Sequence, residues 1–372
     1  MAIFPNDKEM IQDMVAKIRK PTPYLTIDTE KVVHAVQSFQ KFFGVKSVYY
    51  AIKANPDKSV IALLNKLRCN FEVSSGGELK TILNLEIPAS RIISASSIKN
   101  PNFIKSAYEA GIRYFTADSP GEIEMIALNA PGSKISIRLN VSNEGSEWPL
   151  SRKFGVSSEE GVRLLEKAKQ IGLIPWGLSF HVGSQCTRLE TWAEAIDTAS
   201  IFWDLAAAKN IHLKSLNLGG GFPIRYRKPV IRIDEISNAV FENIKKKMPP
   251  IQEIIVEPGR AIIGDAGTMV TSLIAKANRD GQKWFYLDVG VFNGLMESIG
   301  GVKYPIMVNG QGPANKCVLA GPSCDSFDVI DTEAELPDIK IGEHVYILSA
   351  GAYTTAYASK FDGSPVPKIV LI

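Results

Sequence analysis

The sequence predicts an α/β protein in which a (β/α)8 barrel is followed by a separate β domain. From residue 29 onward, short runs of β-branched and aromatic residues alternate with longer segments of helical periodicity. Eight such runs precede Arg260, which is the strand number of a (β/α)8 barrel. A doubly wound open sheet also alternates strands and helices and stays open as the second architecture. After Arg260 the alternation stops, and strand-like segments follow one another with Gly, Pro and Asn between them.

The expected elements follow this order along the chain. Apolar residues at helical spacing predict an amphipathic helix over residues 8–19, and a short strand follows at Tyr24–Ile27. The barrel strands are expected at Ser47–Lys53, Asn70–Val73, Ile92–Ser94, Tyr114–Ala117, Lys134–Leu139, Gly177–His181, Ser215–Leu218 and Glu253–Glu257. Helical patterns between them include Ser59–Leu67, Val162–Ile171 and Thr191–Lys209. Strand-like segments of the β domain begin at Trp284, Cys317 and His344.

The length of the chain and the alternation of strand-like and helical segments together predict the domain organisation. At 372 residues the chain exceeds the usual size of a single hydrophobic core. We therefore expect a barrel domain over residues 24–262 and a β domain formed by residues 1–23 and 263–372, with the N-terminal helix in the β domain.

Composition argues against several classes of function. The net charge is +3 and the basic residues are scattered, so no nucleic-acid partner is expected. No apolar run reaches 18 residues and residues 1–20 lack the apolar core of a secretory signal, so we expect a cytoplasmic protein with no membrane partner. The four cysteines and four histidines lack metal-ligand spacing, so no metal site is expected.

Lys53 is the most informative single residue. It ends the run Ser47-Val-Tyr-Tyr-Ala-Ile-Lys53, which predicts a strand that delivers a lysine into the protein interior. A buried ammonium needs a carboxylate partner or must lose its charge. Formation of a Schiff base with a carbonyl removes the charge, and pyridoxal phosphate is the usual carbonyl in enzymes. The ordinary alternative is a lysine whose stem is buried and whose ammonium reaches water.

Other unusual residues also fall at strand ends. In a (β/α)8 barrel the active site lies at the C-terminal ends of the strands. The residues expected there are Lys53, Arg138, His181, the triplet Gly219, Gly220 and Gly221, and the segment Glu257-Pro-Gly259-Arg260. Each has a structural alternative: the glycines could serve a loop with positive φ, the histidine could be a core residue, and the last segment could form an ion pair. Three successive glycines can also close backbone N–H groups around a phosphate.

Eight short motifs, taken together, carry a family resemblance. They are Tyr50-Ala-Ile-Lys53-Ala-Asn, Phe71-Glu-Val-Ser-Ser-Gly-Gly-Glu-Leu, Lys153-Phe-Gly, His181-Val-Gly-Ser184, Gly219-Gly-Gly-Phe-Pro, Glu257-Pro-Gly-Arg260, Gly321-Pro-Ser-Cys-Asp325 and Gly351-Ala-Tyr353. In this order they resemble the group IV amino-acid decarboxylases, fold-type III pyridoxal-phosphate enzymes of the alanine racemase-like fold. This family includes ornithine, diaminopimelate and arginine decarboxylases, and the short arginine decarboxylases are the most similar. The resemblance spans residues 24 to about 363, nearly the whole chain.

The resemblance implies roles for the residues in the barrel. Lys53 would hold pyridoxal phosphate, Glu257 would pair with the pyridine nitrogen, and His181 would stack on the ring. Phosphate donors would come from Ser184, the glycine triplet with Gly259, Arg260, and Tyr353 of the β domain. Arg138 and Glu72 would orient the cofactor from a second layer.

The resemblance also implies a homodimer with shared active sites. In this family the Cys324-Asp325 pair enters the active site of the neighbouring subunit. Cys324 would protonate Cα after loss of CO2, and Asp325 would face the distal cation of a small basic amino acid. The ordinary alternative for Cys324 is a small buried hydrophobic residue.

The predicted reaction is conversion of L-arginine to agmatine and CO2 in polyamine biosynthesis. Diaminopimelate decarboxylases carry Glu where Asp325 stands, whereas ornithine decarboxylases carry Asp in the loop that matches residues 294–301. Glu297 is the nearest acid in that loop here, and we expect Glu297 and Asp325 to bind a guanidinium together. Ornithine or lysine is the alternative substrate.

Three other functions compete with decarboxylation. A racemase of the alanine racemase type sets an arginine, not Glu257, against the pyridine nitrogen. A non-catalytic, decarboxylase-like regulatory binding protein would have lost cofactor contacts that this chain keeps. A phosphate-binding barrel without pyridoxal would leave Lys53 and Glu257 unexplained.

Overall fold

The computed structural model describes residues 15, 18, 20–150 and 152–372. They divide into two compact units. The barrel unit comprises Val33–Pro223 and Val230–Ala261, and the β domain comprises Ile262–Ile372, Ile224–Pro229 and the described residues before Val33. The helix expected over residues 8–19 lies mostly outside the described residues.

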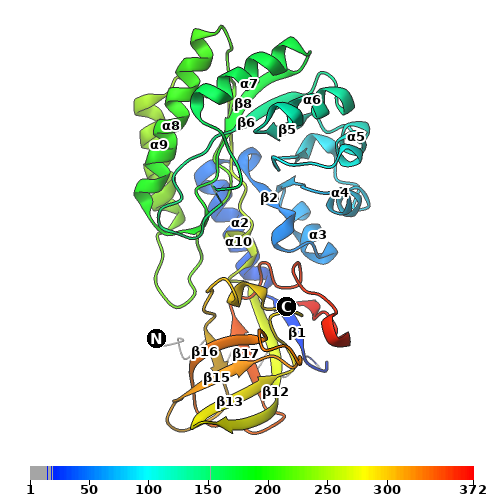
Figure 1. Cartoon of the computed structure of the whole chain (residues 1–372), viewed down its shortest axis with the longest axis vertical. Coiled ribbons are helices and arrows are strands. Elements are labelled where there is room, and N and C mark those ends of the chain that lie inside the picture. Colours follow the sequence, from blue (N-terminus) through cyan, green and yellow to red (C-terminus); the bar gives the residue numbers. More distant parts are fainter. Residues whose placement is uncertain (1–14, 16–17, 19, 151) are drawn as a thin grey trace. The chain divides into compact units, whose positions relative to one another are not determined.

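The barrel unit contains the parallel strands that the sequence predicts (Figure 1). They are β2 (Tyr49–Ala51), β3 (Asn70–Glu72), β4 (Ile92–Ile93), β5 (Tyr114–Ala117), β6 (Lys134–Arg138), β8 (Ile174–Ser179), β10 (Ser215–Asn217) and β11 (Glu253–Ile255). One sheet has the order β2-β3-β4 and the other β11-β10-β8-β6-β5. Both sheets are parallel throughout. A short antiparallel pair, β7 (Ser146–Trp148) with β9 (Ser184–Cys186), adds to the loops.

Two isolated parallel bridges join these sheets into a closed ring. Ser94 pairs with Phe115 between β4 and β5, and Val48 pairs with Val256 between β2 and β11. The backbone N–H of Thr116 donates to Ser94 O at 2.9 Å, and that of Tyr49 donates to Val256 O at 2.9 Å. The ring confirms the (β/α)8 prediction, because an open doubly wound sheet would leave both edge strands unpaired.

Helices lie outside the strands of the barrel (Figure 1). They are α2 (Thr29–Phe43), α3 (Lys58–Lys66), α4 (Gly76–Leu83), α5 (Pro101–Glu109), α6 (Pro120–Asn129), α7 (Ser158–Gln170), α8 (Leu189–Ala208) and α9 (Ile233–Lys247). Several begin at a side chain that accepts a backbone N–H of the first turn, namely Asp57, Ser75, Ser119 and Ser157. Apolar faces of these helices then pack toward the strands. Single-turn 3-10 segments, η1 (Val45–Ser47) and η3 (Ala89–Arg91), lead into β2 and β4.

Lys99 fixes the loop that follows β4. Its ammonium is fully buried and lies 2.6 Å from Glu122 Oε1 of α6. It also donates to the backbone oxygens of Ser96 at 2.7 Å and Thr116 at 2.6 Å. Burial lowers the pKa of Lys99, and the charge of Glu122 opposes that shift. One buried cation therefore ties a strand, a loop and a helix together.

The β domain is built around an eight-stranded sheet. Its strands are β1 (Tyr24–Ile27), β12 (Gly267–Arg279), β13 (Gln282–Leu287), β14 (Ile306–Val308), β15 (Asn315–Ala320), β16 (Val329–Leu336), β17 (His344–Leu348) and β18 (Lys368–Leu371). The main path runs β14-β17-β12-β13-β15-β16, and β1 pairs with β12 and β18. The strands predicted to begin at Trp284, Cys317 and His344 correspond to β13, β15 and β17.

The position of Tyr24–Ile27 corrects the expected barrel domain of residues 24–262. The strand β1 pairs antiparallel with β12 and parallel with β18, so it belongs to the sheet of the β domain. Residues 224–229 also group with the β domain. The reason is physical: an isolated four-residue strand has no stability of its own and takes its place from partners far along the chain.

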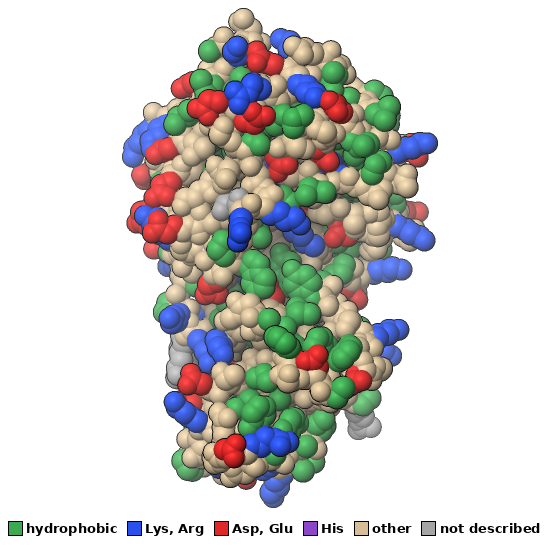
Figure 2. Space-filling model, in the orientation of Figure 1, with side chains coloured by type: hydrophobic (Ala, Val, Ile, Leu, Met, Phe, Trp, Pro, Cys, Tyr) green, Lys and Arg blue, Asp and Glu red, His purple; other side chains and the backbone are tan. Residues whose placement is uncertain are grey.

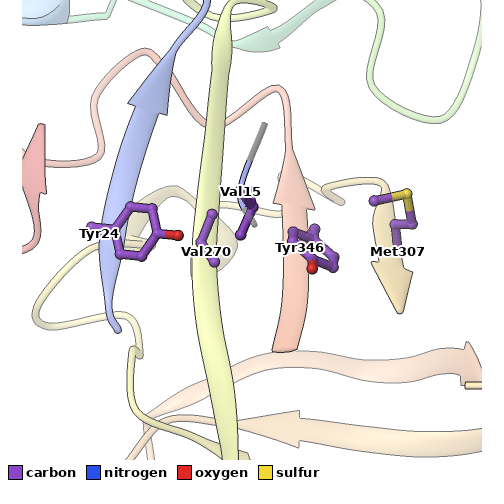
Figure 3. Packing of buried hydrophobic residues seen from close by; sticks show 5 residues of the cluster. All are labelled: Val15, Tyr24, Val270, Met307 and Tyr346. Carbon is purple, nitrogen blue, oxygen red and sulfur yellow. The ribbon is translucent and has the colours of Figure 1, made fainter. Parts of the chain in front are cut away.

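One cross-strand row forms a core of the β domain (Figure 3). Tyr24 faces Val270, Val270 faces Tyr346, and Tyr346 faces Met307 across four neighbouring strands. All four side chains are buried, and Val15 packs against them. The register places large apolar side chains in line, which is how an antiparallel sheet stabilises one face.

Three further features concern surface charge, membrane spans and metal binding. On the face shown in Figure 2, positive and negative side chains are interspersed with apolar ones. Among the described residues, no helix combines the length and the apolar character that a membrane span requires. The same residues contain no group of three His, Cys, Asp or Glu side chains arranged to hold a metal ion.

We expect Lys99→Met to destabilise the protein by about 3–5 kcal/mol, because it leaves Glu122 without its buried cation. Urea unfolding at neutral pH measures the change. The matched control is Lys105→Met, which removes a 64% exposed lysine paired with Glu109 on α5 and should cost less than about 1 kcal/mol. Equal losses for the two variants would contradict the buried-cation account.

Candidate active site

Closure of the barrel makes Lys53 and Glu257 neighbours, although they come from opposite ends of the barrel sequence. Lys53 follows β2 and Glu257 follows β11. Between these segments, Val256 N donates to Ser47 O at 2.9 Å and Ala51 N donates to Pro258 O at 3.3 Å. The two candidate residues therefore leave adjacent parallel strands on the same rim.

Lys53 differs from its prediction in two respects. The strand β2 ends at Ala51, and Lys53 lies in the 3-10 turn η2 (Ile52–Ala54). Asn55 N closes this turn by donating a hydrogen bond to Ile52 O at 3.0 Å. Its side chain is 49% exposed, so the expectation of a buried lysine is wrong. The strand therefore ends two residues earlier than predicted, and the turn brings the ammonium to the rim. There Nζ lies 3.4 Å from Glu72 Oε2.

Glu72 is the buried partner of Lys53. Its side chain is 1% exposed at the end of β3, and Ser74 Oγ donates to its Oε1 at 2.7 Å. Glu78 of α4 lies beyond, and its Oε2 accepts Ser74 N at 2.6 Å. Burial, together with the negative charge of Glu72, raises the pKa of Glu78 to about 7. Sequence reasoning missed Glu78, although it lies within the Phe71-Glu-Val-Ser-Ser-Gly-Gly-Glu-Leu motif.

Arg138 ends β6, as predicted, and a returning loop covers it. Its guanidinium carbon lies 4.7 Å from the centroid of the Phe154 ring. Two hydrogen bonds from backbone N–H groups hold the loop: Gly155 N donates to the side-chain Oδ2 of Asp118 at 2.9 Å, and Val156 N donates to the backbone oxygen of Arg138 at 3.1 Å. Gly155 has φ +90°, and a Cβ there would lie 2.7 Å from Asn140 N. The Lys153-Phe-Gly motif therefore orients the arginine.

His181 follows β8 and is neutral. Its Nδ1 accepts Gly183 N at 3.0 Å, which leaves the proton of the neutral ring on Nε2. Desolvation lowers the pKa of His181 well below its usual value, and the positive charges of Arg138 and Lys53 act in the same direction. Asn143 Nδ2 holds the backbone by donating to His181 O at 3.0 Å. The ring is thus a flat, uncharged surface at the rim.

The glycine triplet follows β10, and each glycine is sterically required. Gly219 and Gly221 have positive φ, and a Cβ would lie 2.2 Å from Phe180 O and 2.4 Å from Gly183 O respectively. At Gly220, a Cβ would lie 2.9 Å from Glu257 O and 3.2 Å from His181 Nε2. The loop is therefore a positive-φ turn whose backbone also lies close to the backbone of Glu257 and to the side chain of His181.

Glu257 is held by Asn217, a residue that sequence reasoning missed. Asn217 is fully buried in β10, where its Nδ2 donates to Glu257 Oε1 at 2.5 Å and its Oδ1 accepts Gly219 N at 2.8 Å. Burial and the charge of Glu72 raise the pKa of Glu257 to about 7, while Asn217, Lys53 and Arg138 oppose the rise. The sequence did contain a signal for Asn217: it is a polar residue within the otherwise apolar strand segment Ser215-Leu-Asn-Leu, and a buried polar side chain needs a hydrogen-bond partner.

Arg260 and Ser184 form the donor pair of the site. Arg260 is 5% exposed at the start of the short helix α10 (Arg260–Ile263), directly after the buried Gly259. Its Nε and Nη2 lie 3.3 and 3.2 Å from Ser184 Oγ. A guanidinium beside a hydroxyl and a glycine loop supplies the donors that a phosphate needs.

These side chains form one cluster, and their chemistry fits pyridoxal phosphate. Lys53 and Arg138 each lower the pKa of both His181 and Glu257, so the four groups share one electrostatic neighbourhood. The cluster combines an exposed amine, an acid with a pKa of about 7, a neutral ring and phosphate donors. An aromatic aldehyde with a basic ring nitrogen and a phosphate has a counterpart for each of them.

The remaining candidates lie in the β domain. Cys324 is exposed, and its backbone N donates to Asp362 Oδ2 at 3.3 Å. Asp325 is partly buried and accepts Phe327 N at 2.8 Å through Oδ1. Tyr353 has φ +57° and stacks on Tyr357, with ring centroids 5.8 Å apart. Glu297 lies in the 3-10 turn η4 (Met296–Ser298) and is only 3% exposed.

Asp328 anchors the loop that carries Cys324 and Asp325. Its carboxylate accepts Val291 N at 2.8 Å and Ser323 N at 3.0 Å, and its carbonyl accepts Gly321 N at 2.8 Å. A Cβ at Gly321 or Gly290 would lie 2.2 or 2.0 Å from Asp328 Oδ1. Gly321 of the motif is therefore needed for packing around a buried carboxylate.

Comparison with known proteins agrees with this geometry. Residues 29–264 match the family model described as pyridoxal-dependent decarboxylase, pyridoxal binding domain. The lysine/ornithine decarboxylase of Selenomonas ruminantium is 34% identical over 93% of this chain and 88% of its own length.

Two solved structures show the same architecture. SrLDC in complex with pyridoxal phosphate and cadaverine superposes with a TM-score of 0.89 at 31% identity, over 100% of this chain and 94% of its own. The Paramecium bursaria Chlorella virus arginine decarboxylase bound to agmatine gives 0.91 at 25% identity, over 98% and 100%. The fold and the recognised family are thereby confirmed, and the relative with the higher identity is the lysine/ornithine enzyme rather than the viral one.

The raised pKa of Glu257 predicts a pH effect on the stability of the cofactor-free protein. Glu257 binds its proton more tightly in the folded state than in the unfolded state, where a glutamate titrates near 4.5. Proton binding to Glu257 therefore stabilises the folded state fully at acid pH, and this contribution to the free energy of unfolding is lost as the pH rises to about 7. We expect Glu257→Gln to remove about 1–3 kcal/mol of the loss between about pH 5 and 8, measured by urea unfolding. Glu78→Gln should act in the same direction. An unchanged pH slope in both variants would contradict these pKa values.

Proposed function

This chain belongs to the pyridoxal-dependent decarboxylases, with pyridoxal phosphate as its cofactor, and we propose that its substrate is L-arginine. The coarser reaction, decarboxylation of a basic amino acid, follows from the family and its relatives. One observation carries the assignment of the site: Lys53 and Glu257 leave adjacent strands of the closed barrel and share one charged cluster. The site roles below are part of the proposal.

The barrel residues would bind and orient the cofactor. Lys53 would hold its aldehyde carbon through the exposed amine, and Glu257 would keep a proton on its ring nitrogen. When bound, pyridoxal phosphate supplies the electron sink that lets the α-carboxylate leave as CO2. Glu257 suits this partnership because Asn217 fixes one of its oxygens and its pKa lies near neutrality.

Other residues would fix the ring and the phosphate. His181 would lie against the ring as a neutral imidazole, because a second cation beside Lys53 and Arg138 is disfavoured. Arg260, Ser184, Gly259 and the triplet at 219–221 would donate to the phosphate, with Tyr353 of the β domain as a further donor. Arg138 and Glu72 would orient these groups from behind, the latter through its 3.4 Å contact with Lys53.

Cys324 and Asp325 would complete the site in a homodimer. Cys324 would deliver the proton that Cα needs after CO2 departs, and Asp325 would meet the distal cation of the substrate. Large apolar side chains are exposed in the same domain: Phe327 is 69% exposed, Tyr357 49% and Phe361 41%. Exposed apolar groups of this size support a partner surface, here a second copy of the chain.

Arginine is favoured by the number of carboxylates available to the distal group. A guanidinium is a planar fork that carboxylates can meet in a bidentate way. Asp325 and Glu297 are the two acids proposed for this role. The viral arginine decarboxylase bound to agmatine shares this fold at a TM-score of 0.91, and so does the lysine/ornithine decarboxylase of Vibrio vulnificus, so the fold accommodates either substrate and the carboxylate count carries the proposal.

Ornithine or lysine is the second candidate, and two observations favour it. The relative of 34% identity is named a lysine/ornithine decarboxylase. Glu297 is 3% exposed, so its carboxylate would have to become accessible before it could meet a guanidinium. With Asp325 alone, an ammonium is the simpler match.

A non-catalytic regulatory binding protein is the alternative from another class. The presence of Lys53, the Asn217–Glu257 pair and the Arg260–Ser184 pair argues against it, since each is a cofactor contact of the proposed site. Visible absorbance of bound cofactor in the purified protein separates the two.

We expect L-arginine to have the highest kcat/KM among arginine, ornithine, lysine and meso-diaminopimelate, measured as CO2 release. The reason is that the two proposed carboxylates can meet a planar guanidinium in a bidentate way, whereas the point charge of an ammonium cannot engage both. Ornithine or lysine as the best substrate would replace the arginine proposal and leave the decarboxylase assignment standing. No CO2 from any of the four would overturn both.

We also expect complementation between two inactive variants. Lys53→Ala should lose the visible absorbance of bound cofactor, and Cys324→Ala should keep it. The matched control is Lys58→Ala, which changes an exposed lysine of the barrel. If each site takes Lys53 from one subunit and Cys324 from the other, mixed dimers contain one intact site, so up to about a quarter of wild-type activity should return. No recovery after demonstrated subunit exchange would argue against shared sites.

A further inference from the structure

The thiol of Cys324 has a dedicated carboxylate partner, Asp362, which none of the motifs contains. Asp362 Oδ2 accepts the backbone N–H of Cys324 at 3.3 Å. The same carboxylate acts on the thiol, because its hydrogen bonding and its charge are the largest causes of the raised pKa of Cys324. The backbone contact therefore places Asp362, which lies 38 residues further along the chain, beside the residue whose titration it affects.

The segment that presents Asp362 is fixed independently of this contact. Ser359 donates to Phe292 O through its backbone N at 2.8 Å and its hydroxyl at 3.2 Å. The ring of Phe361 packs on that of Phe292, with centroids 4.7 Å apart. The 3-10 turn η5 (Phe361–Gly363) is closed by Gly363 N, which donates to Lys360 O at 3.0 Å. These contacts fix the position of the turn that contains Asp362.

Asp362 adopts a backbone conformation that few residues tolerate. Its φ is +57° and its ψ is +20°, in the left-handed region. Asp and Asn enter this region more readily than other non-glycine residues. An aspartate therefore fits this turn, and the turn places its carboxylate at the backbone N–H of Cys324.

Two carboxylates act on the thiol. Asp362 raises the pKa of Cys324 through its hydrogen bond and its charge, and Asp325 raises it through charge alone. Asp325 also accepts Phe327 N at 2.8 Å and so is oriented by its own loop. Negative charge beside a thiol disfavours the thiolate, which suits a proton donor and opposes use as a nucleophile.

We propose that Asp362 is the positioning residue of Cys324: it holds this side chain in place, keeps its proton on sulfur, and so sets the alkaline limit of the reaction. The inference rests on the proposed role of Cys324 as proton donor. In that step the Sγ–H bond breaks, a C–H bond forms at Cα, and the resulting thiolate regains its proton from water. Asp362 touches neither substrate nor cofactor in this scheme.

The test follows the titration of Cys324 in the holoenzyme by iodoacetamide alkylation. Cys69, Cys186 and Cys317 are buried, and the difference between the wild type and Cys324→Ser gives the part of the alkylation rate that belongs to Cys324. In the wild type we expect the midpoint of the rate–pH curve to lie above the ordinary thiol value of about 8.5. A wild-type midpoint at or below that value overturns the proposal without any variant of Asp362.

Asp362→Asn is the decisive variant, because Asn keeps the size and the left-handed backbone but removes the charge. We expect the alkylation midpoint to move to lower pH, alkylation at pH 7.5 to become at least about threefold faster, and the alkaline limb of the kcat profile to move in the same direction. Asp338→Asn, which removes an exposed carboxylate of the same domain paired with Lys276, should change none of these.

The outcomes separate the two proposals. An unmoved thiol titration in Asp362→Asn, with a raised KM for the basic amino acid, would make Asp362 a substrate ligand and overturn the positioning role. A Cys324→Ser holoenzyme with full decarboxylase activity would overturn the proposed proton donor itself, whatever Asp362 does.

Discussion

Closure of the barrel between β2 and β11 is the constraint on which the candidate site depends. The strands are joined by the Val48–Val256 bridge and by the backbone contacts that flank it, from Ser47 to Pro258. These bonds bring the first strand of the barrel beside the last, and with them Lys53 beside Glu257. An open sheet of the same strand order would hold the two residues at opposite edges, and no single cofactor could meet both. The closed barrel backbone therefore decides which side chains can form the candidate site.

The cofactor-free site concentrates charge at a cost to stability. Burial and the negative charge of Glu72 raise the pKa of both Glu257 and Glu78 to about 7, while Lys53 opposes the rise at both residues and Arg138 opposes it at Glu257. Asn217 contributes a neutral donor where another cation would have been harder to bury. A ligand that brings a proton to Glu257 and anionic oxygens to Arg260 would complete this arrangement, and any such ligand stabilises the folded state in proportion to its binding.

Much of this fold was predictable from the sequence because barrel strands carry strong local signals. All eight expected strands overlap the observed ones, since each apolar run is bounded by turn residues. Local sequence signals do not predict features of the structure that depend on residues far along the chain. The apolar run through Ile52 does not reveal that the backbone turns at Lys53, and nothing near Tyr24–Ile27 identifies β12 and β18 as its neighbours. The site shows the same division. Motifs identified the groups at the rim, whereas Asn217 and Asp362 act through contacts with residues far along the chain.

The Gly321-Pro-Ser-Cys-Asp325 motif illustrates how structural and chemical requirements interleave within one short segment. Gly321 is needed because the buried Asp328 carboxylate occupies the space of its missing side chain. Asp328 in turn binds Ser323 N and Val291 N, and so joins this loop to the segment that contains Phe292. Phe292 supports the turn that presents Asp362 to Cys324. A buried carboxylate with backbone donors thus fixes the loop, and a second carboxylate acts on the thiol it carries. The two acids are chemically alike, and burial with the partners supplied decides which one is structural and which one can tune a proton.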